Sequence, residues 1–307
     1  MLTDMFLKIF ATVLLPLTVI VGLAFVLGRT GRQDYGPLAR TSFYLFNPSL
    51  AFVSMAGATV TADLLGRLVV LKVGVFLLMI ALSAAVAWRM GLTGPAGSAF
   101  MLAATFANSG NYGLFVAEAA FGTPGLSLAV ICYVTDNLLA NSAGVYLAAR
   151  GRATARQAFV QVFRNPALYA VPLGLAVNHF GWIVPQPAMR VLELLGRAAV
   201  PTMLVVLGLQ LSLLPRDQGN WTAIGVASVL RLAVAPLFGF LLTLPLGLTG
   251  LARQVGILQV AVPTAVLTSI IAARYDTEPK LVAGTVMVTS LASLLTVTAL
   301  LTLLAAR

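Results

Sequence analysis

One apolar stretch in the first half of the chain is interrupted by the polar segment Ala107-Asn-Ser-Gly-Asn-Tyr-Gly113. Asn and Gly are weak helix formers, so a helix is expected to break here. Asn108 and Asn111 each carry two N–H donors and one acceptor, and Ser109 and Tyr112 add hydroxyl groups. Because these groups gather at one break, the segment is a candidate binding site.

The second half of the chain carries a comparable interruption, Gln259-Val-Ala-Val-Pro-Thr264. Pro263 has no N–H and its ring clashes with the preceding turn, which frees carbonyl groups there. An interrupted helix persists in hydrocarbon only where it is buried in protein or lines a cavity. Half-helix N-termini carry partial positive charge and C-termini partial negative charge, so two crossing breaks favour an anion site beside a cation site. The alternative is that the polar residues only join helices and that Pro263 only kinks one.

Asp136 is the clearest ionisable group inside an apolar stretch, and Asn137 follows it. Such a group is costly in a membrane and marks a functional site by default. Its carboxylate is suited to hold a sodium ion, with Asn108 and Asn137 as neighbouring oxygen ligands, or to carry a proton. The alternative is a structural role, in which Asp136 is the ion-pair partner of Arg231. Arg231 has no acidic neighbour within a helical turn, so it must reach another segment, a helix C-terminus or an anionic ligand. Lys72 is expected near an interface, with its ammonium group extended toward water.

Several enzyme and pump classes are excluded by missing motifs. The sequence has no P-loop, no H-E-x-x-H or G-x-S-x-G motif, and no Cys or His pair at metal-binding spacing. We therefore expect no enzymatic activity and no cofactor apart from the sodium ion considered above. The cations are scattered between apolar runs rather than gathered in one stripe, so nucleic acid is not an expected partner.

The composition places these residues in a lipid bilayer. Of the 307 residues, 60% are hydrophobic and 9% are charged. A soluble domain carries roughly 25% charged residues, so this chain cannot build a water-facing surface. The first apolar stretch is expected to be a retained span rather than a signal peptide.

Runs of about 20 apolar residues predict ten membrane-crossing helices. They cover residues 6–28, 37–59, 66–88, 97–121, 125–149, 166–183, 187–213, 221–246, 251–274 and 279–304. The two interrupted segments fall in the fourth and ninth of these helices, and Asp136 and Arg231 fall in the fifth and eighth.

The two halves share landmarks at nearly one spacing. Pro48 corresponds to Pro201, and Gly110 corresponds to Pro263. We therefore predict an all-α membrane protein with ten transmembrane helices in two inverted five-helix repeats, whose broken fourth and ninth helices cross at mid-membrane. The first repeat would span residues 1–149 and the second residues 166–307, joined by a basic cytoplasmic loop at 150–165.

The loop charges predict the orientation. Lys and Arg are more numerous on the side of the loop at 150–165 than on the opposite side. The positive-inside rule then places this loop in the cytoplasm and both termini outside it, in the cell (inner) membrane.

Several segments, in this order and spacing, resemble the auxin efflux carrier family, the bacterial relatives of the plant PIN-type carriers, with a fold like that of the bile acid/sodium symporters. The segments are Asn47-Pro48, Thr105 to Gly113, Arg164-Asn-Pro166, Leu207-Gly-Leu-Gln-Leu211, Arg231 and Ala261-Val-Pro-Thr264. The resemblance implies a scaffold part and a transport part, a homodimer, and export or exchange of small organic carboxylates such as malate, malonate or auxin-like acids. It assigns carboxylate binding to Asn108. The chain departs from the family at Ala107, where the family has a proline.

Together, these observations predict a secondary transporter of small organic anions that works by alternating access. The expected substrate-binding residues are Asn108, Ser109, Asn111, Tyr112, Pro263, Thr264, Asn47 and Arg231. The expected ion-coupling residues are Asp136, Asn137 and Asn108, with sodium, protons or the membrane potential alone as the driving force. The alternative is a membrane sensor or receptor that binds the same ligand without moving it.

Overall fold

The computed structural model describes residues 2–31, 34–58, 60–149, 163–215 and 219–305. Within these ranges the protein is all-helical, and the extended pairing present is one isolated antiparallel bridge between Ala107 and Thr264. Most of the basic loop predicted at 150–165 lies outside the described residues.

The first half of the chain consists of long helices, several of which contain a π-helical turn (labelled η). In order, the elements are α1 (Leu2–Ile9), η1 (Phe10–Leu14), α2 (Leu15–Gly31), α3 (Gly36–Thr41), η2 (Ser42–Phe46), α4 (Asn47–Ala56), α5 (Ala62–Arg89), α6 (Gly94–Thr105), η3 (Ser109–Leu114), α7 (Phe115–Leu139), η4 (Ala140–Gly144) and α8 (Val145–Ala149). Inside α7, Gly122 has φ 67° and ψ −164°, values open mainly to glycine, and kinks the helix.

The described part of the second half also consists of helices, with one π-helical turn. Its elements are α10 (Ala167–Phe180), α11 (Gln186–Ser212), α12 (Trp221–Val229), η5 (Leu230–Val234), α13 (Ala235–Thr243), α14 (Gly250–Ala261), α15 (Val266–Arg274) and α16 (Pro279–Ala305). Polar residues set several helix ends. Asn220 accepts a hydrogen bond from the Ala223 N–H at the start of α12, and Gly181 ends α10 in the left-handed conformation.

Six helical segments of the described residues are long and apolar enough to cross a bilayer. They are Leu2–Gly31, Ala62–Arg89, Ser109–Ala149, Gln186–Ser212, Trp221–Thr243 and Pro279–Ala305. Large apolar side chains such as Leu23, Leu77 and Leu295 are exposed on their outer faces. Because so much exposed apolar surface is unfavourable in water, the chain is an integral membrane protein.

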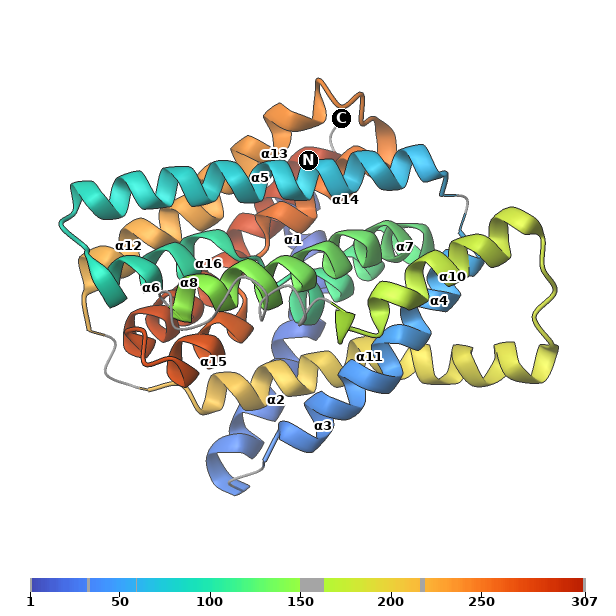
Figure 1. The fold of residues 1–307 in the computed structure, drawn as a ribbon, viewed down its shortest axis with the longest axis horizontal. Helices are drawn as coiled ribbons and strands as arrows, with labels where there is room; N and C mark the ends of the chain where they lie inside the picture. Colours follow the sequence, from blue (N-terminus) through green and yellow to red (C-terminus); the bar gives the residue numbers. More distant parts are fainter. Residues whose placement is uncertain (1, 32–33, 59, 150–162, 216–218, 306–307) are drawn as a thin grey trace.

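The helices form two bundles that each combine both halves of the chain. We call the first the outer bundle: α11 packs against α2 and α4, and α10 packs against α4. We call the second the crossing bundle: it contains α5 to α8 and α12 to α16, with α14 against α7 and α13 and with α16 against α6 and α12. In Figure 1, α10 and the first part of α11 extend well beyond the crossing bundle.

The helices α6 and α14 are similar in length and in their ends. Each has 12 residues, begins after an extended threonine (Thr93 or Thr249), and ends at an extended residue (Phe106 or Val262). Phe106 and Val262 are buried, so each half-helix stops inside the protein, and the residues that follow the two ends, Ala107 and Thr264, pair with each other.

Candidate functional site

The two interrupted helices pair with each other through their backbones. The Asn108 N–H donates to the Pro263 carbonyl oxygen at 2.8 Å, and the Ala265 N–H donates to the Phe106 carbonyl oxygen at 2.9 Å. Each break thus satisfies polar backbone groups of the other, which a low-dielectric surrounding requires. The interrupted segments that the sequence singled out are therefore in direct contact.

A cavity of about 440 Å³ lies between the two bundles and reaches this pairing. The outer bundle lines it with η2 and with Met203, Val206 and Gln210 of α11; the crossing bundle lines it with η3, α7, η4 and the start of α15. Three of these elements are π-helical turns, which occur frequently at functional sites. A cavity between two bundles is positioned so that relative movement of the bundles changes its exposure.

Six carboxamide side chains dominate the polar lining of this cavity. They are Asn47, Asn108, Asn111, Asn137, Asn141 and Gln210. Amides donate and accept hydrogen bonds without carrying charge. The remaining lining includes the aromatic residues Phe43, Tyr44 and Tyr133, so a ligand would meet both amide donors and apolar surface.

Two helix N-termini face the same cavity. Residues 108–111 form the N-terminus of the continuous helix made by η3 and α7. Ala265 and Leu267 lie at the N-terminus of α15. Free N–H groups at a helix N-terminus carry partial positive charge and bind anions. The lining is therefore electrostatically suited to a negatively charged ligand.

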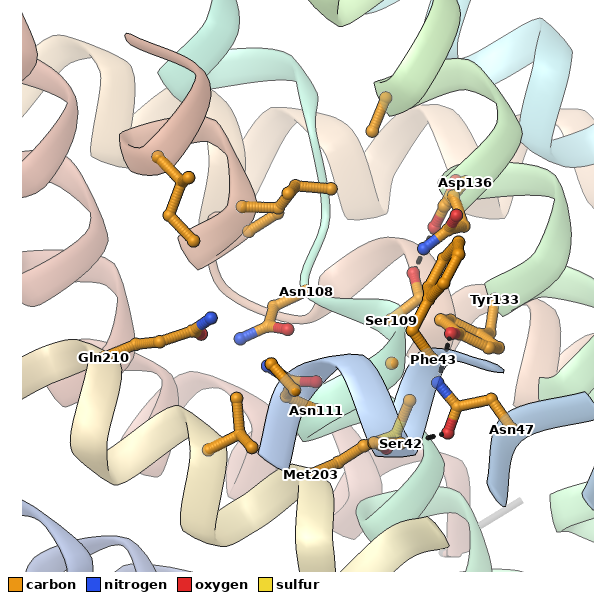
Figure 2. Close-up of a pocket in the computed structure, with 18 of the residues that line it drawn as sticks. Ser42, Phe43, Asn47, Asn108, Ser109, Asn111, Tyr133, Asp136, Met203 and Gln210 are labelled. Atoms are coloured by element: carbon orange, nitrogen blue, oxygen red, sulfur yellow. Dashed lines mark hydrogen bonds between the residues drawn. The ribbon is translucent and has the colours of Figure 1, made fainter. Parts of the chain in front are cut away.

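Asn108 and Gln210 offer polar atoms that nothing in the described structure uses. Asn108 is 5% exposed and Gln210 is 9% exposed. The Asn108 Nδ2 donor and the Gln210 Oε1 acceptor have no hydrogen-bond partner among the described residues. Figure 2 shows the two amides pointing toward each other from opposite bundles. Since buried polar groups are almost always paired, this unpaired donor at two helix N-termini is the strongest mark of a ligand site.

Other lining amides are fixed by hydrogen bonds. The Ser42 hydroxyl donates to Asn47 Oδ1 at 3.1 Å, and Asn47 Nδ2 donates to the Tyr133 hydroxyl oxygen at 2.8 Å, as Figure 2 shows. Asn137 Oδ1 accepts from Asn141 Nδ2 and from Asn165 Nδ2, both at 2.9 Å. These residues shape the wall of the cavity.

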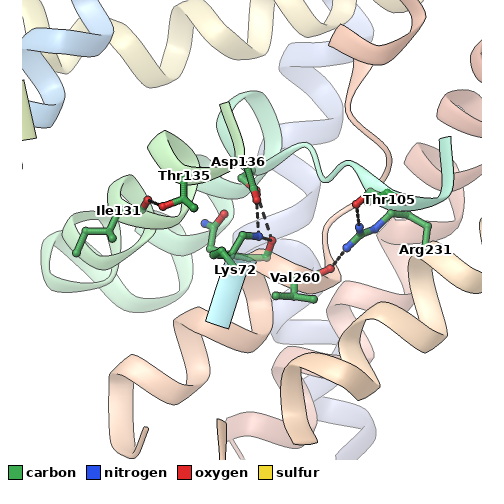
Figure 3. A network of polar contacts seen from close by, with 9 residues as sticks. Lys72, Thr105, Ile131, Thr135, Asp136, Arg231 and Val260 are labelled. Carbon is green, nitrogen blue, oxygen red and sulfur yellow. Dashed lines mark hydrogen bonds and ion pairs between the residues drawn. The ribbon is translucent and has the colours of Figure 1, made fainter. Parts of the chain in front are cut away.

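Lys72 is buried in an ion pair, contrary to the interfacial position expected for it. It is 3% exposed, and its Nζ lies 2.7 Å from Asp136 Oδ2 and donates to the Gln259 carbonyl oxygen at 2.8 Å. Figure 3 shows Lys72 beside Asp136, and the Ser109 hydroxyl also donates to the Asp136 carboxylate. No local pattern indicates this partnership, because Lys72 and Asp136 are far apart in the chain and meet only when α5 packs against α7.

Arg231 binds helix ends rather than Asp136 or the cavity. It is 1% exposed and donates to the carbonyl oxygens of Thr105, at 2.7 Å, and Val260 (Figure 3). These carbonyls belong to the C-terminal ends of α6 and α14, which carry partial negative charge. Of the three destinations that the sequence allowed, Arg231 takes the helix C-terminus.

Three other expected binding residues lie outside the cavity lining and form hydrogen bonds around the paired helix breaks. The Tyr112 hydroxyl oxygen accepts from the Ser293 hydroxyl at 3.1 Å, and Thr264 Oγ1 donates to the Ala103 carbonyl oxygen at 2.8 Å. Pro263 provides the carbonyl oxygen that accepts from the Asn108 N–H.

The structure brings Asn47, Asn108, Ser109 and Asn111 to the cavity, together with Asp136 and Asn137. It adds Gln210, which lies in a segment used for the family resemblance but was not expected to bind ligand.

Fold and site together define a helical integral membrane protein with a cavity at paired helix breaks, whose lining combines amide side chains with apolar surface. Residues 148–301 match the model of a family described as membrane transport protein. The chain belongs to this family, and the resemblance to auxin efflux carriers is confirmed.

The curated relatives include archaeal and plant proteins. An uncharacterized transporter of Methanothermobacter thermautotrophicus is 28% identical over 275 residues, which cover 88% of this chain and 89% of the relative. An uncharacterized transporter of Methanocaldococcus jannaschii is 27% identical over 201 residues, covering 64% of this chain and 65% of the relative. Auxin efflux carrier component 1 of Arabidopsis thaliana is 27% identical over 133 residues, 41% of this chain and 21% of that protein.

Proposed function

We propose that the protein is a secondary carrier of small organic anions, with a carboxylate as the group that it recognises. The observation that carries the proposal is the unpaired Asn108 Nδ2 donor, buried where two helix N-termini line one cavity. A carboxylate there gains charge-assisted hydrogen bonds, which are stronger than neutral ones. The plant relative named for auxin efflux supports the same ligand class.

Alternating access is the transport mode that this arrangement favours. The cavity lies between two bundles, and its binding groups come mostly from the crossing bundle, so movement of that bundle against the outer bundle would carry the ligand with it. We propose for the chain the ten-helix arrangement in two inverted repeats, with residues 1–149 and 166–307 as the halves, in a homodimer in the inner membrane.

We propose that Lys72 supplies the positive charge expected beside the anion site. Lys72 Nζ already contacts the Asp136 carboxylate and the Gln259 carbonyl, oxygen atoms that a sodium ion would need. Arg231 likewise occupies carbonyls at the ends of α6 and α14. A sodium ion at Asp136 would have to displace a paired ammonium group. We therefore propose uniport or exchange of the anion, driven by its gradient and the membrane potential, without sodium.

Counterflow in proteoliposomes tests the function. Vesicles containing the purified protein are loaded with unlabelled malonate or indole-3-acetate, and the labelled compound is added outside. A carrier accumulates label transiently, in sodium or potassium buffer alike. Binding of the compounds without counterflow would instead indicate a sensor, and neither binding nor counterflow would contradict the carboxylate assignment.

Asn108→Ala provides the internal comparison for this assay. It removes the unpaired donor and should abolish most of the counterflow, whereas Gln186→Ala at the exposed start of α11 removes an amide remote from the cavity and should leave the rate unchanged. Equal rates in both variants would contradict the placement of the site.

A further inference from the structure

The crossing bundle holds buried charges that do not sum to zero. In the part of the chain that the structure describes, Lys72 and Arg231 are the two charged side chains that are almost completely buried. Asp136 is the acid that faces them, with its side chain 16% exposed. All three belong to the crossing bundle, on α5, η5 and α7.

The pair of Lys72 and Asp136 contributes no net charge. Their charged atoms lie 2.7 Å apart, so a proton placed on either partner leaves the sum of the pair at zero. This sum therefore does not depend on which partner holds the proton.

Arg231 contributes one positive charge that no acid neutralises directly. The guanidinium group stays protonated in proteins. Its described partners are carbonyl oxygens, and no ion pair to it is found among the described residues. The empty crossing bundle thus carries one net positive charge in its interior.

The cavity lies beside these groups, since Asp136 lines both it and the small pocket that contains Lys72 and Arg231. A buried charge is unfavourable unless another charge compensates it. A ligand with one negative charge would bring the sum to zero, whereas a dianion would leave one net negative charge. Arg40 also lines the cavity, but it is exposed and lies on α3, outside the crossing bundle.

We propose that the carrier binds a monoanion, that the loaded crossing bundle is electrically neutral, and that the membrane potential therefore acts on the empty carrier. This inference rests on the proposed function. Moving one elementary charge across a full potential of 100 mV changes an equilibrium by about 50-fold, which sets the upper limit of the effect. The step that returns the empty carrier would be accelerated by a negative interior when the net flux is outward.

The test compares two transport modes in the same proteoliposomes, with potassium gradients and valinomycin setting the potential. In counterflow with saturating indole-3-acetate on both sides, only the loaded carrier moves. In net efflux into substrate-free buffer, the empty carrier must return. We expect counterflow at −100 mV to stay within about twofold of its rate at zero potential, while net efflux rises severalfold toward the limit above.

Each departure from this pattern overturns a defined part of the proposal. Counterflow that changes strongly with potential would show that the loaded carrier is charged. Net efflux that does not respond would show that the empty carrier is uncharged. Malonate counterflow that is faster than that of indole-3-acetate and independent of potential would overturn the proposal that the ligand carries one negative charge. Absence of counterflow for every carboxylate would overturn the proposed function, and this inference with it.

Variants of Arg231 assign the charge to a residue. Arg231→Gln should make the empty carrier neutral and the loaded one negative, so that counterflow becomes dependent on potential. Arg231→Lys keeps the charge and should restore the behaviour of the unmodified protein. Arg190→Gln removes an exposed cation of α11, paired with Glu193, and serves as the charge-matched control. A potential-independent counterflow in Arg231→Gln would overturn the assignment, and the measurements on the unmodified protein decide the proposal even if that variant does not fold.

Discussion

At the scale of single residues, the site depends on Asn108, whose side-chain N–H donor has no hydrogen-bond partner among the described residues. Asn108 Nδ2 is buried without a described partner, while most other lining amides are already bonded. A buried donor without a hydrogen-bond partner in the protein costs free energy, and a ligand that accepts a hydrogen bond from it removes that cost. Replacement of Asn108 should therefore weaken ligand binding while the protein still folds.

Asn108→Ala is expected to weaken carboxylate binding by about ten- to a hundredfold, since a hydrogen bond to a charged group contributes roughly 1.5–3 kcal/mol. Asn108→Asp should weaken it further because two negative charges would meet. Isothermal titration of the purified variants measures both effects, and unfolding temperatures confirm that they remain folded. Unchanged affinity in Asn108→Asp would show that the carboxylate binds elsewhere.

Lys72 and Asp136 are expected to be coupled in stability. Lys72→Met or Asp136→Asn alone leaves a buried charge without its partner and should destabilise the protein by about 3–5 kcal/mol. The double variant removes both charges and should regain much of this loss. Thermal unfolding in detergent of the four proteins gives the coupling free energy, and additive single effects would contradict the ion pair.

At the scale of elements, the π-helical turns and half-helices bring side chains together that regular helices would separate. The turn η3 places Gly110 against the ring of Tyr133, where an added Cβ would lie 2.7 Å from a ring carbon. This close approach fixes the position of the η3 backbone beside the cavity. The hydroxyl oxygen of the same Tyr133 accepts the hydrogen bond from Asn47 Nδ2.

Gly110→Ala should therefore lower the stability by about 1–3 kcal/mol, as overpacking typically does, and reduce transport. The matched control is Gly225→Ala in α12, where an added Cβ has no neighbour within 4 Å. That substitution should be neutral or stabilising by up to about 1 kcal/mol, because alanine favours a helix over glycine. Equal effects at both positions in thermal unfolding would show that the contact with Tyr133 is unimportant.

At the scale of the whole molecule, the two bundles and their cavity make ligand binding visible as a change in stability. A ligand that binds only the folded protein raises its stability by mass action, by about 2.7 kcal/mol at 100 times its dissociation constant. A thermal-shift panel of monocarboxylates and dicarboxylates is therefore expected to identify stabilising compounds, with equal shifts in sodium and potassium buffer. A shift that requires sodium would contradict the role assigned to Lys72.

The orientation in the membrane is testable with introduced cysteines. Cys132 is the chain's single cysteine and is buried, so Cys132→Ala provides a suitable background. Asp34→Cys should react with an impermeant maleimide only from the cytoplasmic side, and Ile183→Cys, at a position 93% exposed, only from the outside. Labelling of both from one side would contradict the predicted topology.

Composition and local pattern determined the membrane location, the helical class and the positions where helices are interrupted. Hydrophobic content and the weak helix propensity of Asn and Gly act locally, so they can be read without knowing the fold. The sequence accordingly predicted Asn108, Ser109, Asn111 and Asp136 as site residues, and all four line the cavity. The family followed from the order of short motifs along the chain.

The partners of these residues were decided only by the tertiary structure. Lys72 meets Asp136, and Arg231 meets the ends of α6 and α14, because helices distant in the sequence pack side by side. Gln210 reaches the cavity because α11 packs beside η3. A sequence shows which side chains are costly to bury, but which charge compensates which depends on distances of a few ångströms that only packing sets.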